Sequence, residues 1–193
     1  KKTLHIDEHL LREARTASGA KTDTDAVRLG LEALVRHAAY QRLTALRGSE
    51  PARVMATPSG ADHVDSALGC VTVLVDTSVW IRFLANRAPY AAELEDLLRR
   101  DEVCAHDFVY GELLIGDVGG RKQLLEDYEQ MHQAPPVPHV DVVAFVRGRR
   151  LHGRGIGWID AHLLASSLVG RLKLWTTDPR LAALARELGV SYE

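Results

Sequence analysis

Four acidic residues stand where an α/β fold places catalytic groups: Asp76, Glu112, Asp160 and Asp178. Asp76 directly follows the β-branched run 71–75, which is typical of a buried central strand. Asp178 occupies a similar place after a second strand-like run. Because ligands of open α/β sheets bind outside the carboxyl ends of the strands, both carboxylates are candidates for a functional site.

Glu112 and Asp160 fall in segments with helical character. Glu112 is flanked by apolar Leu113 and Ile115, so it does not lie on a freely solvated stripe, and Asp160 opens an otherwise apolar helix. Carboxylates packed together repel and raise one another's pKa values. One or two Mg²⁺ or Mn²⁺ ions relieve this repulsion, since hard cations prefer oxygen ligands. Such a site typically hydrolyses phosphodiesters, because the metals activate water and stabilise the leaving oxygen.

Each acid also has a purely structural interpretation. Asp76 and Asp178 could cap the helices that follow them, and Asp160 could interact with a helix dipole. Glu112 could pair with a buried arginine. The occurrence of four acids at comparable points of one α/β alternation favours the catalytic interpretation.

The residues around the acids carry a family resemblance. Val-Asp-Thr-Ser-Val-Trp, Tyr-Gly-Glu-Leu-Leu-Ile-Gly, Ile-Asp-Ala-His-Leu-Leu-Ala-Ser and Thr-Thr-Asp resemble, in order and spacing, the four motifs of the PIN domain. Within that family, residues 73–193 are most similar to the toxin component of VapBC toxin–antitoxin pairs. The resemblance implies a metal-dependent endoribonuclease in which the four acids are catalytic and bind the metal. It also implies that Thr77 and Thr177 support the metal ligands through their hydroxyls.

Two other enzyme classes do not fit the sequence. A phosphotransferase of the haloacid dehalogenase type needs a second acid two positions after Asp76, where Ser78 stands. A dinucleotide site needs Gly-x-Gly-x-x-Gly after the first strand, and that motif is missing.

A basic stretch precedes Asp160. It contains Arg147, Arg149, Arg150 and Arg154. These side chains could form a solvated helix face, or they could clamp the phosphates of an RNA substrate.

The N-terminal segment has a different character. Leu4 and Ile6 alternate with polar residues at strand period, and two helical stretches follow, about 8–17 and from Thr22 or Asp23 to about Leu46. This pattern resembles a ribbon-helix-helix antitoxin of the VapB kind, in which paired strands from two chains bind the DNA major groove. The resemblance implies at least a dimer that binds operator DNA. Candidate DNA contacts are Lys2, Thr3 and His5.

Residues 48–70 contain Gly, Ser, Pro, Ala and Asp with few large apolar groups, as in a linker or an arm that wraps the toxin. By resemblance to antitoxins, this region could place an arginine against the acids. The candidates are Arg42, Arg47 and Arg53. The arrangement leaves open whether antitoxin and toxin are a natural fusion, an engineered tether or two separate products written as one chain.

Composition and charge limit the classes of protein that this sequence can encode. The net charge of −2 divides into +1 for residues 1–70 (10 Lys/Arg, 9 Asp/Glu) and −3 for residues 71–193 (14 and 17). No apolar run approaches the ~20 residues that span a bilayer. Cys70 and Cys104 are too few for a disulfide framework, so we expect reduced thiols in a cytoplasmic protein with no membrane partner.

The alternation of strands and helices predicts an α/β fold: a PIN-like domain with a mostly parallel sheet flanked by helices, after a small ribbon-helix-helix segment. The predicted divisions are 1–47, 48–70 and 71–193. Strands are expected at 71–75, 102–105, 134–137, 172–176 and 190–192. Helices are expected at 78–85, 90–100, 107–116, 121–132, 139–152, 159–170 and 179–188.

The leading hypothesis is a toxin–antitoxin protein whose ribonuclease domain is inhibited by its own antitoxin segment. Two alternatives remain: a DNA-binding repressor with an inactive PIN domain, and an RNA-processing PIN nuclease with an unrelated N-terminal segment.

Overall fold

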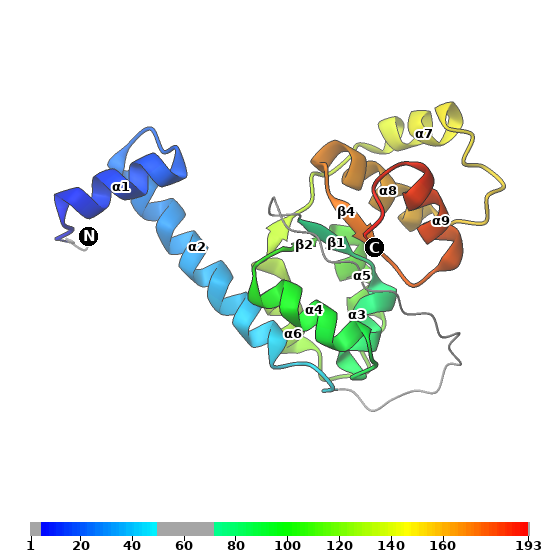
Figure 1. Cartoon of the computed structure of the whole chain (residues 1–193), viewed down its shortest axis with the longest axis horizontal. Helices are drawn as coiled ribbons and strands as arrows, with labels where there is room; N and C mark the ends of the chain where they lie inside the picture. Colours follow the sequence, from blue (N-terminus) through cyan, green and yellow to red (C-terminus); the bar gives the residue numbers. More distant parts are fainter. Residues whose placement is uncertain (1–4, 50–71, 193) are drawn as a thin grey trace.

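A parallel four-stranded sheet lies at the centre of the C-terminal part of the chain, in a computed structural model that describes residues 5–49 and 72–192 (Figure 1). The strand order is β3-β2-β1-β4, and every neighbouring pair is parallel. The strands are β1 (Val73–Val75), β2 (Val103–Ala105), β3 (His132–Gln133) and β4 (Lys173–Trp175).

Helices connect the strands and cover the sheet, which confirms the α/β class expected from the sequence. The helices of this part are α3 (Thr77–Leu84), α4 (Tyr90–Arg99), α5 (Asp107–Ile115), α6 (Lys122–Glu129), α7 (His139–Gly148), α8 (Trp158–Gly170) and α9 (Pro179–Glu187). Parallel neighbours require such crossovers, because their ends lie at opposite edges of the sheet. The carboxyl ends of β1 and β4 therefore meet at one edge.

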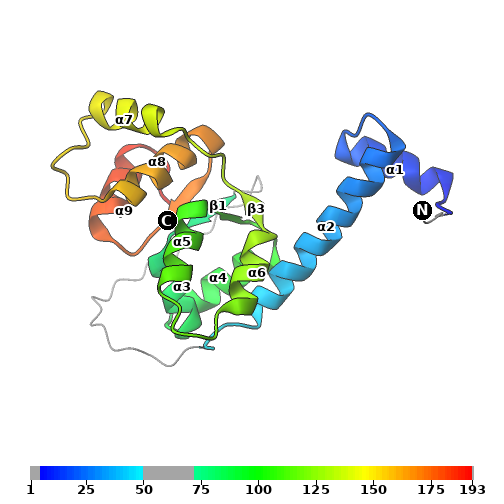
Figure 2. The ribbon, with the colours of Figure 1, turned by 180° about the vertical axis from the view of Figure 1, so that it is seen from behind.

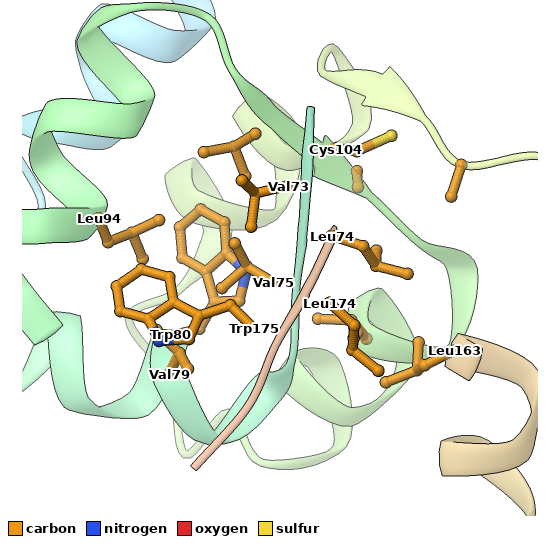
Figure 3. Close-up of a cluster of buried hydrophobic side chains, with 14 of the residues drawn as sticks. Val73, Leu74, Val75, Val79, Trp80, Leu94, Cys104, Leu163, Leu174 and Trp175 are labelled. Atoms are coloured by element: carbon orange, nitrogen blue, oxygen red, sulfur yellow. The ribbon is translucent and has the colours of Figure 1, made fainter. Parts of the chain in front are cut away.

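Both faces of the sheet are buried, as the β-branched run in β1 predicts. Figure 3 shows Val73 and Val75 on one side of β1, and Leu74 on the other. The first face packs against Trp80 of α3 and Leu94 of α4, while Leu163 of α8 lies on the second face. A strand that is buried on both faces needs apolar residues throughout, and for this reason β1 lacks a polar alternation.

Two expected strands differ from the structure. The strand predicted at 134–137 is wrong, because β3 ends at Gln133. Ala134 still donates its backbone N–H to the Ala105 carbonyl at 2.8 Å, but Pro135 and Pro136 follow and have no N–H to continue the ladder. At 190–192 the structure forms only a bridge between Leu174 and Ser191.

The N-terminal part is a helical hairpin. It consists of α1 (Glu8–Ser18) and α2 (Asp23–Thr44). The Asp7 carboxylate accepts hydrogen bonds from the first turn of α1, and Gly19 ends that helix with a positive φ of 64°. The expected strand residues Lys2, Thr3 and Leu4 lie outside the described residues, and so does most of the 48–70 segment.

The hairpin projects from the α/β domain. Figures 1 and 2 show α2 leaving the domain beside α4 and α6 and carrying α1 at its far end. None of the residues of α1 is buried. The hairpin therefore has no core of its own within a single chain.

The C-terminal half of α2 docks on the α/β domain. Tyr40 and Leu43 are fully buried in the main core cluster, whose other members all lie in residues 73–190. The Tyr40 hydroxyl donates to the Val103 carbonyl, and Arg42 contacts the buried Asp127 carboxylate through Nε at 2.7 Å and Nη2 at 2.5 Å. The α/β domain thus carries nearly all of its own core, and α2 adds two anchoring side chains.

Within the described ranges, no helix is both long enough and apolar enough to cross a membrane.

The Arg42–Asp127 contact gives a first prediction. Arg42→Ala removes this donor from Asp127, which is only 1% exposed and also accepts a hydrogen bond from Gln123 at 2.9 Å. Because the Asp127 carboxylate is buried, we expect Arg42→Ala to lower the free energy of unfolding, measured by urea titration.

The matched control is Arg28→Ala, which breaks an exposed pair with Glu32 and should lower the free energy of unfolding less than Arg42→Ala does. Equal effects of the two substitutions would show that the Arg42 contact does not hold the helix in place.

Candidate active site

Asp76 is the most buried of the four acids, at 7% exposure. It ends β1 and stands at the N-cap position of α3, yet its side chain makes no capping bond. Its Oδ2 atom instead accepts hydrogen bonds from Ser78 at 2.6 Å and from Thr176 at 2.7 Å. The carboxylate is therefore oriented by hydroxyls, and simple capping does not explain it.

Asp178 lies in the loop after β4, beside Asp76. Thr176 links the two, because its hydroxyl donates to Asp76 and accepts the Asp178 backbone N–H at 3.0 Å. The Asp178 side chain is exposed and caps α9, accepting from the amides of Arg180 at 2.8 Å and Leu181 at 2.9 Å. For this residue the capping interpretation is confirmed, and the catalytic interpretation stays a prediction.

Glu112 and Asp160 reach the same region from α5 and α8. The Thr77 hydroxyl donates to Glu112 Oε2 at 2.5 Å, which ties the first residue of α3 to α5. Asp160 accepts the Gly157 backbone N–H at 2.7 Å, in the first turn of α8. Four separate elements thus contribute the four carboxylates.

The carboxylates influence one another electrostatically. The pKa of Asp160 is raised, first by burial and then by the negative charges of Asp76, Asp178 and Glu112, while the Gly157 N–H opposes the shift. Within residues 5–49 and 72–192, however, no group of three or more His, Cys, Asp or Glu side chains is arranged as a ready metal site. Uncompensated carboxylates repel, and each of these is held by neighbouring donors.

The supporting hydroxyls differ in part from those expected. Thr77 contacts Glu112, but the hydroxyl that reaches Asp76 from the loop after β4 belongs to Thr176. Thr177 contributes its backbone N–H, which donates to Ser78 Oγ at 3.1 Å. Ser78 and Thr176 are therefore functional candidates that the sequence analysis missed. The sequence could have indicated both residues, since Ser78 lies two positions after Asp76 and Thr176 lies two positions before Asp178.

His106 was also missed, and it joins the helices that carry Glu112 and Asp160. It caps α5: its Nδ1 accepts the Phe108 N–H at 3.1 Å, which requires a neutral ring with the proton on Nε2. Nε2 then donates to Ser166 of α8 at 3.0 Å. Burial, with a smaller opposing effect of Asp107, lowers the pKa of His106 to about 4.

The expected RNA-binding arginines lie between α7 and α8 or at the end of α7. Arg147, Arg149 and Arg150 are exposed. Arg154 pairs with Glu187 of α9 at 2.6 Å. The stretch is therefore available at the surface, although one of its cations already has a carboxylate partner.

The arginines considered for inhibition are placed away from the acids where they are described. Arg42 pairs with Asp127, and Arg47 contacts Glu95 at 2.5 Å and Asn86 at 2.8 Å. Arg53 lies outside the described residues. Of the predicted DNA contacts, His5 is exposed, while Lys2 and Thr3 are not described.

Comparison with known proteins agrees with this geometry. Residues 73–187 match the PIN domain family, and residues 1–46 match the family described as "Bacterial antitoxin of type II TA system, VapB". Two relatives are Ribonuclease VapC32 from Mycobacterium tuberculosis strains CDC 1551 / Oshkosh and ATCC 25618 / H37Rv. Each is 46% identical over 120 residues, which cover 62% of this chain and 94% of the relative.

The chain therefore belongs to the PIN-domain family. Its matched region contains all four acids. The chain joins a VapB-type antitoxin segment to this domain, so it has the composition of a VapBC pair within one polypeptide.

The buried His106 gives a pH prediction. Its pKa is about 4 in the folded protein against 6.5 ordinarily, so the unfolded state binds more protons between these values and stability falls as pH decreases. Between pH 6.5 and about pH 5 the loss is about 2 kcal/mol, at 1.36 kcal/mol per pKa unit.

Urea unfolding at both pH values tests this. His106→Gln should be less stable at neutral pH but should lose about 2 kcal/mol less on acidification than the unchanged protein. His9→Gln, at an exposed position on α1, is the control and should leave the pH dependence unchanged. A pH dependence that is identical in His106→Gln would contradict the assignment of a neutral, buried ring.

Proposed function

We propose that residues 71–193 form a metal-dependent endoribonuclease and that residues 1–70 act as its antitoxin. The observation that carries the proposal is the convergence of Asp76, Glu112, Asp160 and Asp178 within electrostatic reach of one another, from four different elements. The relatives named Ribonuclease VapC32 support the same activity. The alternative of an inactive PIN domain is disfavoured because all four acids are present.

The side chains fit a divalent cation. They offer carboxylate oxygens, with threonine and serine hydroxyls that fix their orientation, and hard cations such as Mg²⁺ or Mn²⁺ prefer such ligands. The raised pKa of Asp160, caused by burial and by three neighbouring carboxylates, marks the repulsion that a cation would relieve. When bound, the metal would supply an activated water and stabilise the leaving oxygen.

The chain's own residues orient the ligands and guide the substrate. Thr77 holds Glu112, while Ser78 and Thr176 hold Asp76, so the carboxylates keep their positions when a cation or an RNA phosphate enters. The exposed Arg147, Arg149 and Arg150 are proposed to bind phosphates of the RNA backbone, whose affinity then falls as salt concentration rises.

The antitoxin segment is proposed to inhibit by staying docked. Tyr40, Leu43 and Arg42 fix the end of α2 on the domain, so residues after α2 begin at the toxin surface. The backbone N–H of Gly48 donates to the carbonyl of Phe83 at 3.0 Å. Phe83 belongs to α3, the helix that begins directly after Asp76. Because Arg42 and Arg47 are engaged in docking, Arg53 is the remaining candidate for a guanidinium that competes with the metal.

The hairpin is proposed to form a dimer that binds operator DNA. An open groove along α1 and α2 reaches the end of α6 at Glu129. Its lining combines charged side chains with the apolar residues Ile6, Leu11, Val27, Leu31 and Val35. Leu31 and Val35 are 55% and 51% exposed, and a helical surface of this kind needs a partner to bury it. A second copy provides one, since a two-fold interface uses the same surface on both chains.

The first functional prediction concerns cleavage. The 71–193 fragment holds its own core and corresponds in size to the complete VapC32 relatives, so it is expected to fold alone. It should cleave RNA with Mg²⁺ or Mn²⁺ and stop when EDTA is added. Asp76→Asn should keep the circular dichroism spectrum and lower the rate by about 10²-fold or more, because a ligand and its charge are lost.

Asp141→Asn, an exposed position on α7, is the matched control and should cleave normally. Undiminished cleavage by Asp76→Asn would refute the active-site assignment.

The second prediction concerns inhibition. A tether gives the antitoxin a local concentration of roughly millimolar, so the full chain should be nearly inactive where the fragment is active. If Arg53 competes with the metal, Arg53→Ala or high Mg²⁺ should restore part of the activity, because a cation beside the carboxylates weakens metal binding. Cleavage is followed on the same RNA for all proteins.

Equal rates for the full chain and the fragment would rule out an inhibitory segment. An inactive full chain that neither change rescues would instead indicate that the segment covers the path of the RNA.

The third prediction concerns assembly and DNA. The full chain should sediment as at least a dimer and bind a palindromic site in its own promoter. His5→Ala should weaken specific DNA binding without changing the mass, whereas His9→Ala, on the exposed surface of α1, serves as the control. A strictly monomeric full chain is incompatible with the ribbon-helix-helix assignment.

A further inference from the structure

A row of five rings runs across the N-terminal ends of α7, α8 and α5, which we name the ring row: His139, Trp158, His162, Phe108 and His106. Ring centroids are 5.0 Å apart for His139–Trp158 and for Trp158–His162. They are 4.5 Å apart for His162–Phe108 and 5.5 Å for Phe108–His106. The contacts join three helices that are distant in the sequence into one continuous aromatic surface.

The row is buried on one side and open on the other. His106 and His162 are 6% and 5% exposed, and they pack against the rings next to them. Trp158 and Phe108 are 42% and 37% exposed. Packing accounts for the buried histidines, but it does not account for two large rings that remain open to solvent beside them.

One of the open rings borders an acid. Phe108 and Glu112 are four residues apart on α5, so they share one face and are separated by about one turn, a rise of about 6 Å. Trp158 stands two positions before Asp160 and faces a different side of α8, but its ring contacts His162, which in turn contacts Phe108. The row therefore extends away from the Glu112 side of the acids, in a direction that nucleotides next to the scissile phosphodiester could follow.

Charges on the segments that carry the row favour a nucleic acid over an apolar protein surface. The exposed Arg147 lies in the last turn of α7, and Arg149 and Arg150 follow in the connection to α8. The same helix α7 carries His139 at its first position, and α8 begins with Trp158. Aromatic rings with neighbouring cations are the usual platform for single-stranded nucleic acid, since bases stack on the rings and phosphates meet the cations.

We propose that Trp158 and Phe108 form a stacking platform for unpaired bases of single-stranded RNA, beside the nucleotide whose phosphodiester is cut. This inference rests on the proposed ribonuclease function and adds how the substrate is held. His162 and His106 act as positioning residues that keep the two open rings in place. Because every base has a π-face, the platform selects single strands over duplexes more than it selects a sequence.

Tryptophan fluorescence provides a direct test, because Trp80 and Trp175 are buried and Trp158 is the exposed one of the three. The 71–193 fragment with Asp76→Asn, which prevents cleavage, is titrated in Mg²⁺ with a mixed-sequence RNA of about 12 nucleotides. We expect quenching on binding. Trp158→Ala should weaken binding, measured by anisotropy of labelled RNA, by about tenfold or more, and Phe108→Ala should act in the same direction.

Two variants serve as controls. Trp158→Phe keeps a stacking face and should bind within about threefold of the parent. Val169→Ala, an exposed position near the other end of α8, should bind like the parent. An abasic ribose-phosphate chain of equal length should bind the parent and Trp158→Ala equally, because it offers phosphates but no bases.

Equal RNA affinity of Trp158→Ala and the parent would overturn the platform, and so would an equal loss with the abasic chain. A change in sedimenting mass with unchanged RNA affinity would also overturn it and assign the row to a protein interface. Cleavage by the unsubstituted fragment is measured separately. If the fragment binds RNA through its bases but does not cleave it, the nuclease assignment is refuted while the platform stands. If the fragment cleaves RNA but its binding does not depend on the bases, only the platform is refuted.

Discussion

The repulsion among four carboxylates at the carboxyl edge of a parallel sheet is the constraint on which the rest of this structure depends. Asp76 and Asp178 follow adjacent strands, so the register of β1 and β4 fixes their proximity. Glu112 and Asp160 approach from α5 and α8. Burial raises the pKa of Asp160, and the charges of Asp76, Asp178 and Glu112 add to that shift. The Thr77 hydroxyl holds Glu112, and the hydroxyls of Ser78 and Thr176 hold Asp76. His106 joins the helices α5 and α8 that carry Glu112 and Asp160.

The N-terminal segment solves a different physical problem. The hairpin of α1 and α2 is too small to bury its own apolar residues, and Leu31 and Leu34 remain exposed in the single chain. At its other end, α2 lends Tyr40 and Leu43 to the core of the PIN domain. One helix therefore connects an exposed apolar surface at the hairpin with a docked end in the PIN domain.

The sequence was sufficient for the parts of the fold that depend on local pattern. The run in β1 and the order of the four motifs predicted the central strand and the family, and the two helical stretches expected after Ile6 correspond to α1 and α2. It was insufficient where prolines end a ladder, as at β3, and where contacts join distant segments. The link from Thr176 to Asp76, the link from His106 to Ser166 and the Arg42–Asp127 pair each depend on packing that no spacing rule specifies.

The central claim is that four acids from four elements act as one cation site. Calorimetric titration of Mn²⁺ into the 71–193 fragment tests it most directly. Asp160→Asn and Asp178→Asn should each weaken Mn²⁺ binding by about tenfold or more, because each removes one oxygen ligand and its charge. Asp141→Asn, on the exposed surface of α7, should bind like the unchanged fragment. Unaltered Mn²⁺ affinity in both Asp160→Asn and Asp178→Asn would contradict a shared site.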